Sequence, residues 1–184
     1  LGAFAPEAFL RRHWQKRARL FRDAIPGFTG PFSRGDLFAL ACRDDVESRL
    51  VVRTDRRWSV DHGPFAPRTL ASLPPRAWTL LVQGTNLVDA RADALMRRFD
   101  FIPYARLDDV MVSYAAPGGG VGPHVDSYDV FLLQGFGRRR QLPEAFGERH
   151  PQRVLAVARP EPVPIRLVEG LVPGDDVRRV PHHR

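Results

Sequence analysis

Three segments of the chain carry apolar residues three or four positions apart, which is the spacing of an amphipathic helix. The first runs from Pro6 to Phe21, and proline is well tolerated in a first helical turn. The second begins after Ser33, whose hydroxyl can cap the free amides of a helix that ends at Ala41. The third covers residues 88–99 and alternates apolar with charged positions. We expect a helix in each segment.

Short runs rich in β-branched and aromatic residues predict strands between and after these helices. Three such runs lie in the first half of the chain, at residues 49–54, 58–61 and 78–83. From Asp109 onward, apolar runs are short and separated by Gly and Pro, a pattern that favours a jelly roll. Its strands are expected at residues 110–115, 124–134, 138–142, 153–158, 163–168 and 177–180. The pattern predicts one domain, with an α/β part over residues 1–108 and a jelly-roll core over 109–184.

The large aromatic and imidazole side chains outside any motif are assigned structural roles. Trp14, Trp58 and Trp78 are expected to fill the core. His13, His62 and His150 are expected to be core or surface residues rather than ligands, because none belongs to a motif.

Composition is that of an ordinary globular protein, with 184 residues of which 43% are hydrophobic. No apolar run approaches the roughly 20 residues of a membrane helix, and the start has no signal-peptide pattern. The chain begins with Leu1 instead of Met, so we expect a fragment of a longer protein. Cys42 is the only cysteine, which excludes an internal disulfide and is typical of a cytoplasmic protein.

The formal net charge of +7 comes almost wholly from arginine, since Lys16 is the only lysine. Arginine clusters favour phosphate and carboxylate partners, which suggests proximity to the ribosome or to RNA. Arginine bias of the genome, or loss of acidic parts in a fragment, explains the charge equally well. No nucleic-acid-binding module accompanies the charge, so both interpretations stay open.

The chemistry of the chain is concentrated just after Gly118-Gly119-Gly120. His124 and Asp126 follow, and residues two apart in a strand point to the same face, so both side chains can bind one ion. They would supply two thirds of the facial triad of two His and one carboxylate that is typical of non-haem Fe(II) oxygenases. The glycines themselves predict a turn back into the sheet, because no Lys-Ser/Thr follows as a phosphate cradle requires.

The segment Val121–Gly135, followed by Gly137-Arg138-Arg139-Arg140, resembles the core of the bacterial JmjC-type ribosomal oxygenases. The resemblance extends over most of residues 1–140, through the segments 13–16, 26–28, 40–42, 45–50 and 78–84. It implies a cupin-like double-stranded β-helix with an N-terminal α/β cap. It also implies a dioxygenase that uses Fe(II), 2-oxoglutarate and dioxygen to hydroxylate an arginine side chain of a large-subunit ribosomal protein.

The resemblance assigns co-substrate binding to the middle arginine, Arg139. In a strand Arg139 points opposite to its two neighbours, so one guanidinium can face the barrel interior while two face water. A buried guanidinium needs an anion, and the distal carboxylate of 2-oxoglutarate would supply one in a bidentate pair.

The end of the chain departs from the family pattern. The expected Pro-Gly-Asp turn is present at Pro173–Asp175, but the charged segment Asp176–Arg184 replaces the expected apolar strand. We take His183 as the third metal ligand, with His182 or a residue beyond Arg184 as alternatives. Gln141-Leu142 stands where the family commonly has tryptophan, so the jelly-roll core is expected to be incomplete at the C-terminus.

Two other functions stay open at this point. One is a catalytically dead cupin-like binding module, which the unusual tail favours. The other is a basic ribosome- or RNA-binding domain, which the arginine content favours. The oligomeric state stays open, with a C-terminal region missing from this sequence as one expected means of forming an oligomer.

Overall fold

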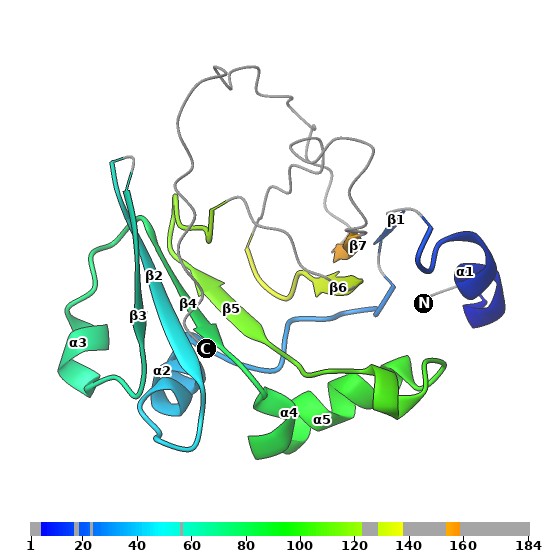
Figure 1. Cartoon of the computed structure of the whole chain (residues 1–184), viewed down its shortest axis with the longest axis horizontal. Helices are drawn as coiled ribbons and strands as arrows, with labels where there is room; N and C mark the ends of the chain where they lie inside the picture. Colours follow the sequence, from blue (N-terminus) through cyan, green and yellow to red (C-terminus); the bar gives the residue numbers. More distant parts are fainter. Residues whose placement is uncertain are drawn as a thin grey trace, which may run out of the picture.

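The fold is known from a computed structural model, which describes residues 5–16, 19–22, 24–55, 57–122, 129–137 and the backbone of 154–158. A four-stranded sheet and a smaller three-stranded sheet form its framework. Helices lie along the four-stranded sheet and beyond the smaller sheet (Figure 1).

The larger sheet is antiparallel and has the strand order β3-β2-β4-β5. Its strands are β2 Ser48–Thr54, β3 Arg57–His62, β4 Trp78–Val82 and β5 Val112–Ala115. Leu80 in β4 lies opposite Leu50 on one side and Tyr114 on the other. The strands predicted at residues 49–54, 58–61, 78–83 and 110–115 are therefore confirmed, with ends that shift by one or two residues.

One face of this sheet is covered by the helices α2 Arg34–Ala41 and α3 Pro67–Ala71. Side chains of Leu50, Trp78 and Leu80 pack there against Leu37 and Leu40 of α2. All five residues of β4 are buried, as expected for a strand in the centre of a sheet. This apolar layer covers one face of β4.

Helix α2 begins as the sequence predicts. The Ser33 hydroxyl accepts a hydrogen bond from the Asp36 amide at 3.2 Å, and the Asp36 carboxylate accepts one from the Ser33 amide at 2.8 Å. This reciprocal arrangement is a capping box, which satisfies two amides that would otherwise lack partners. The Ser33 backbone hydrogen bond also lowers the pKa of Asp36 below its ordinary value.

A second apolar cluster lies around Phe9, which is fully buried. It joins helix α1 Pro6–Arg12 to the smaller sheet, whose order is β1-β7-β6 and whose pairings are parallel. The strands of this sheet are β1 Arg19–Arg22, β6 Val130–Leu133 and β7 Val154–Ala158. The smaller sheet thus brings the start of the chain beside segments more than a hundred residues away.

The prediction of one helix from Pro6 to Phe21 is wrong. Helix α1 ends at Arg12, Gln15 has a φ of 53°, and Phe21 lies in strand β1. A positive φ at a residue with a side chain breaks a helix. Phe9 and Phe21 still share one apolar cluster, but they reach it from a helix and a strand.

The helix predicted over residues 88–99 is divided into shorter pieces. They are α4 Thr85–Val88, α5 Ala90–Met96 and the 3-10 turn η1 Arg97–Phe99. Asp89 interrupts the helix because its extended backbone lets its carboxylate accept a hydrogen bond from the Arg91 amide at 2.8 Å. The Arg91 side chain also donates to this carboxylate and lowers the pKa of Asp89. A further turn, η2 Tyr104–Arg106, and helix α3 were not predicted.

The three tryptophans occupy different environments. Trp78 is buried in the first cluster, and Trp14 is half-buried against the second, as expected. The prediction for Trp58 is wrong, because 40% of its surface is exposed on strand β3. His13 is buried and His62 is exposed, whereas His150 lies outside the described residues.

Several predicted strands cannot be compared with the structure. Those at residues 138–142, 163–168 and 177–180 lie outside the described residues. The strand expected at 124–134 is represented by β6, and the one expected at 153–158 by β7. Among the residues described, no helix has the length and apolar character needed to cross a membrane.

Strand β5 ends in a tight glycine turn that is bonded to strand β4. The Ala116 amide donates to the Trp78 carbonyl at 3.0 Å, and the Gly119 amide donates to the Ala116 carbonyl at 2.8 Å. Gly118 has a φ of 74°, which favours glycine. A Cβ atom built on Gly119 would lie 2.1 Å from the Trp78 carbonyl oxygen, so no side chain fits there. The predicted role of these glycines as a turn is confirmed.

We expect Gly119→Ala to lower the free energy of unfolding by about 2–3 kcal/mol, at the upper end of overpacking costs, because buried backbone must move. Gly120→Ala is the matched control, since a Cβ there meets only the Trp58 ring at 3.6 Å, an ordinary contact. It should change stability by less than about 1 kcal/mol. Urea unfolding of both variants measures the difference, and equal stabilities would contradict the role assigned to Gly119.

Candidate metal and co-substrate site

The predicted metal ligands His124, Asp126 and His183, and the predicted co-substrate residue Arg139, lie outside the described residues. The structure does describe the chain on both sides of the His-x-Asp motif. Gly122 precedes the motif by two residues, and Asp129 follows it by three. The frame of the candidate site is therefore built from these two flanks.

The preceding flank is the glycine turn after β5. This turn is fixed to β4 through the Trp78 carbonyl, and β4 lies within the larger apolar cluster. Gly122, with a φ of 75°, then turns the chain once more before the motif begins. The route into the motif is thus set by backbone bonds and by glycine conformations that other residues rarely adopt.

The following flank is held by a polar contact and by aromatic packing. The Asp129 carboxylate accepts a hydrogen bond from the Gln15 amide at 3.0 Å. In β6, the Phe131 ring lies 4.6 Å from that of Phe99 and is stacked on Trp14 at 5.8 Å. The segment after the motif is therefore attached to the N-terminal part of the chain. Gln15 and Asp129, which make the polar contact, are 114 residues apart in the sequence.

The sheet face opposite the helices carries small and polar side chains among larger apolar ones such as Val51 and Leu81. Strand alternation places Thr79 there, opposite Ala115, with Leu81 opposite Ser113. Thr79 is fully buried, and its Oγ1 has no hydrogen-bond partner among the described residues. A buried hydroxyl without a partner costs about 1–3 kcal/mol, so this face suits a polar ligand. Nothing in the sequence pattern distinguished Thr79 from its neighbours.

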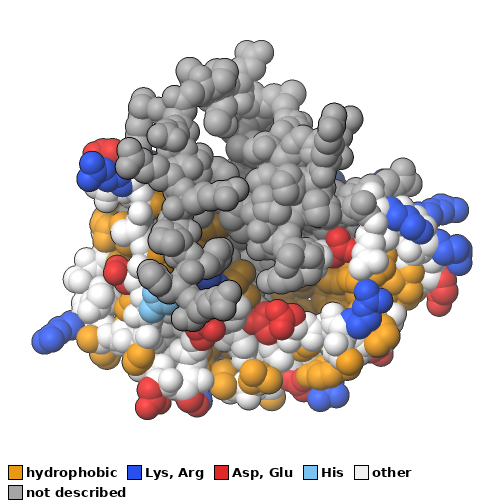
Figure 2. Space-filling model, in the orientation of Figure 1, with side chains coloured by type: hydrophobic (Ala, Val, Ile, Leu, Met, Phe, Trp, Pro, Cys, Tyr) orange, Lys and Arg blue, Asp and Glu red, His pale blue; other side chains and the backbone are white. Residues whose placement is uncertain are grey.

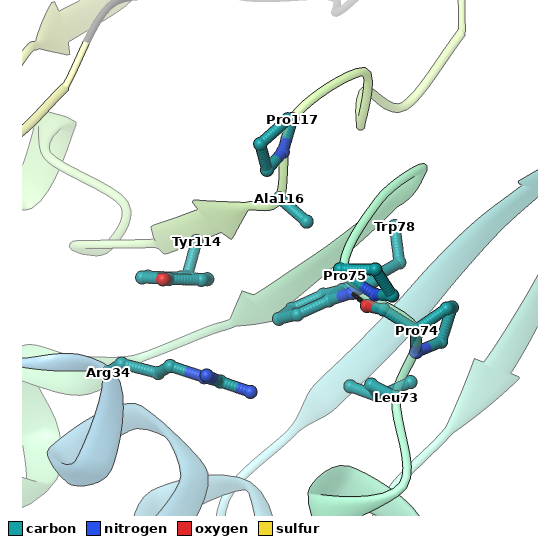
Figure 3. Close-up of a pocket in the computed structure, with 8 residues that line it drawn as sticks. All are labelled: Arg34, Leu73, Pro74, Pro75, Trp78, Tyr114, Ala116 and Pro117. Atoms are coloured by element: carbon teal, nitrogen blue, oxygen red, sulfur yellow. Dashed lines mark hydrogen bonds between the residues drawn. The ribbon is translucent and has the colours of Figure 1, made fainter.

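A pocket of about 320 Å³ lies on the other face of the sheet, between α2, the loop before β4 and strand β5. Figure 3 shows the Arg34 side chain reaching toward the rings of Tyr114 and Trp78, with Pro74 and Pro75 beside Trp78. The Arg34 guanidinium lies 4.7 Å from the Phe38 ring centroid and 5.8 Å from that of Trp78. Because this pocket opens on the helical side, it is separate from the face that carries Thr79.

Within the described part of the chain, no three His, Cys, Asp or Glu residues come together as a metal site. The donor set that the sequence predicts therefore stays a prediction. Its chemistry suits a divalent first-row metal, because a neutral imidazole and a carboxylate are ligands that non-haem iron accepts.

The chain matches the family model described as the JmjC domain over residues 94–160. This range begins in α5, contains β5, the glycine turn and β6, and ends just after β7. The matched range therefore includes both flanks of the His-x-Asp motif.

Two curated bacterial proteins are similar to the chain. The "Ribosomal protein uL16 3-hydroxylase" of Escherichia coli (strain K12) is 48% identical over 132 residues, covering 72% of this chain and 35% of that protein. The "Probable ribosomal oxygenase" of Haemophilus influenzae is 43% identical over 136 residues, covering 73% of this chain and 33% of that protein. The chain thus spans about a third of the length of these relatives.

Solved structures of YcfD, a ribosomal oxygenase from Escherichia coli, share the fold. One contains cobalt and 2-oxoglutarate, and another contains cobalt and succinic acid. Each has a TM-score of 0.64 and 43% sequence identity, over 67% of this chain and 34% of the YcfD chain. The expected cupin-like fold is therefore confirmed. The matched domain, the two relatives and the shared fold together show that this chain is similar, over about two thirds of its own length, to the JmjC-domain ribosomal oxygenases.

Proposed function

We propose that this chain carries the metal- and co-substrate-binding region of a 2-oxoglutarate-dependent oxygenase that hydroxylates a ribosomal protein. The observation that carries this proposal is the match of the chain to YcfD, whose structure contains cobalt and 2-oxoglutarate. The finer proposal is hydroxylation of an arginine side chain in a large-subunit ribosomal protein. The name of the Escherichia coli relative, a hydroxylase of ribosomal protein uL16, supports the class of substrate.

In this proposal His124 and Asp126 hold the metal, with His183 as the third ligand. The imidazole of His124 binds in its neutral form, and the Asp126 carboxylate contributes a negative charge that favours a divalent cation. Iron(II), when bound together with 2-oxoglutarate, would allow dioxygen to oxidise both the 2-oxoglutarate, to succinate and CO2, and the carbon centre that is hydroxylated. The chain itself sets the geometry, because both flanks of the motif are attached to other parts of the fold, which limits where the two ligands can lie.

Arg139 orients the co-substrate by pairing its guanidinium with the distal carboxylate of 2-oxoglutarate. A planar guanidinium can donate two parallel hydrogen bonds to a carboxylate, which fixes direction as well as position. The buried Thr79 hydroxyl lies on a face suited to a polar ligand. Its position supports a co-substrate site beside the glycine turn.

The substrate class is consistent with the charge of the chain, which is +7. Figure 2 shows Lys and Arg side chains gathered at the end of the molecule that carries α1, whose last turn contains Arg11 and Arg12. Such a basic end favours proximity to ribosomal RNA. Action on a ribosomal protein also implies a cytoplasmic location.

The first test of this proposal concerns the metal. Asp126→Ala and His124→Ala should each reduce Fe(II)-dependent formation of succinate from 2-oxoglutarate by more than ~100-fold, since even outer-shell changes cost 10–100-fold. Asp126 is the sharper position, because its carboxylate is the only anionic ligand in the predicted set. Succinate is measured by mass spectrometry, with the thermal unfolding midpoint of each variant determined alongside.

Asp108→Ala is the matched control, because Asp108 is an exposed carboxylate in the same matched domain. It should leave succinate formation unchanged. Normal turnover in both ligand variants would contradict the metal site. If the unsubstituted chain shows no turnover but binds RNA in a salt-dependent way, the results would favour a basic binding domain instead.

The second test concerns the co-substrate. Arg139→Lys keeps the charge but loses the planar fork, so it should weaken 2-oxoglutarate binding by about 1.5–3 kcal/mol, or roughly ten- to a hundred-fold. Arg138→Lys and Arg140→Lys are the controls and should have little effect, because strand alternation predicts that their side chains point away from that of Arg139. Calorimetric titration with 2-oxoglutarate measures all three, and equal losses would mean that the arginines form a surface patch.

A further inference from the structure

The exposed tryptophan of strand β3 lies against the glycine turn. A Cβ atom built on Gly120 would be 3.6 Å from Trp58 Cη2, and one built on Gly122 would be 3.7 Å from Trp58 Cε2. Among the described residues, and apart from the chain neighbours of Gly120, only Trp58 lies within 4 Å of that position. The indole therefore covers alternate residues of the segment that leads into the His-x-Asp motif.

An arginine on the neighbouring strand extends this contact. Arg53 in β2 lies directly opposite Trp58 in the strand register, and its guanidinium is 5.8 Å from the indole centroid. A Cβ atom built on Gly118 would be 3.8 Å from Arg53 Nη2. Gly118, Gly120 and Gly122 thus lie along a surface made by these two side chains, which we call the Arg53–Trp58 platform.

The platform and the glycine segment are held in different ways. Strands β2 and β3 pair over six positions, and the Arg53–Trp58 pair is the last but one before the turn of this hairpin, in which β2 is also paired with β4. Glycine has the greatest backbone freedom of any residue, and it has no side chain with which to pack. Contacts with the platform therefore help to restrict residues 118–122, in addition to the backbone bonds at Ala116 and Gly119.

Exposure of Trp58 is consistent with such a role. An indole left 40% exposed contributes less to the core than a buried one, yet its inner surface lies on the glycines. Val60, two residues along β3 and on the same face, is 51% exposed and is absent from the neighbourhood of Gly120. The two side chains share a strand and a face but differ in their contact with the turn.

We propose that Trp58, supported by Arg53, is a positioning residue that holds the Gly118–Gly122 segment and thereby sets the direction in which His124 and Asp126 leave the sheet. The effect on the metal rests on the proposed function, because it assumes that these two residues are ligands. The effect on the glycine segment does not depend on it.

Hydrogen exchange on the metal-free full chain tests whether Trp58 holds the glycine segment. Trp58→Ala should raise the exchange of the amides of residues 118–122 by at least about fivefold, relative to the unsubstituted chain, while β4 remains protected. Trp58→Phe keeps a planar ring and should restore most of the protection. Val60→Ala is the matched control and should leave exchange in this segment unchanged.

Cobalt(II) titration of the same variants tests whether Trp58 also affects metal binding. Trp58→Ala should weaken cobalt(II) binding on the order of tenfold, comparable to the loss of a ligand-supporting group, and should alter the visible absorption bands that report ligand geometry. Trp58→Phe should recover both properties, whereas Val60→Ala should match the unsubstituted chain. If Trp58→Ala does not fold, Trp58→Leu replaces it, because leucine is apolar but lacks the planar surface.

The two arms separate the possible failures. Exchange and cobalt(II) binding that are the same in the Trp58 and Val60 variants would overturn the positioning role. Increased exchange with unaltered cobalt(II) affinity and spectrum would overturn the link from the platform to the ligands. Absence of cobalt(II) binding in the unsubstituted chain would instead contradict the proposed function, and the exchange arm would still decide whether the platform holds the turn.

Discussion

The close approach of two backbones, at Gly119 and at the Trp78 carbonyl, is the constraint on which the rest of this structure depends. A Cβ atom at Gly119 would lie 2.1 Å from that carbonyl oxygen, so the chain can pass there only without a side chain. Strand β4, which supplies the carbonyl, is buried along its whole length. The glycine turn is therefore attached to the most buried strand of the sheet, and the His-x-Asp motif begins five residues later.

Two separate apolar clusters hold the two sides of the motif. The cluster on the helical face of the larger sheet fixes β4 and β5, and hence the segment before the motif. The Phe9 cluster fixes β6, which follows it, through ring contacts of Phe131 with Phe99 and Trp14. In the proposed site, ligands on a segment that is attached at both ends would lose less freedom when a metal binds, which is how preorganised sites gain affinity.

Local patterns predicted the elements whose causes are local. The capping residue Ser33 marked the start of α2, and the runs at residues 49–54 and 78–83 marked β2 and β4, because these signals lie within a few neighbouring positions. Phe21 was misassigned because its strand exists through pairing with β7, more than a hundred residues away. Spacing alone cannot distinguish such a strand from a continued helix.

In the candidate site, too, features with local causes could be predicted, whereas contacts between distant segments could not. The His-x-Asp motif and the arginine run could be predicted from residue types and their resemblance to a family, although these residues lie outside the described part of the chain. The contact of Trp58 with Gly120 and Gly122 could not, because a β3 residue meets a turn some sixty positions later. An exposed tryptophan in a strand has no local signature that separates it from a core residue.

A crystal structure of the full chain grown with cobalt(II) and 2-oxoglutarate would test the central claim most directly. The account predicts one metal ion bound by both His124 and Asp126, with the glycine turn against Trp58 and the distal carboxylate of 2-oxoglutarate paired with Arg139. A metal ion bound elsewhere, or His124 and Asp126 directed to different sides of the segment, would contradict it.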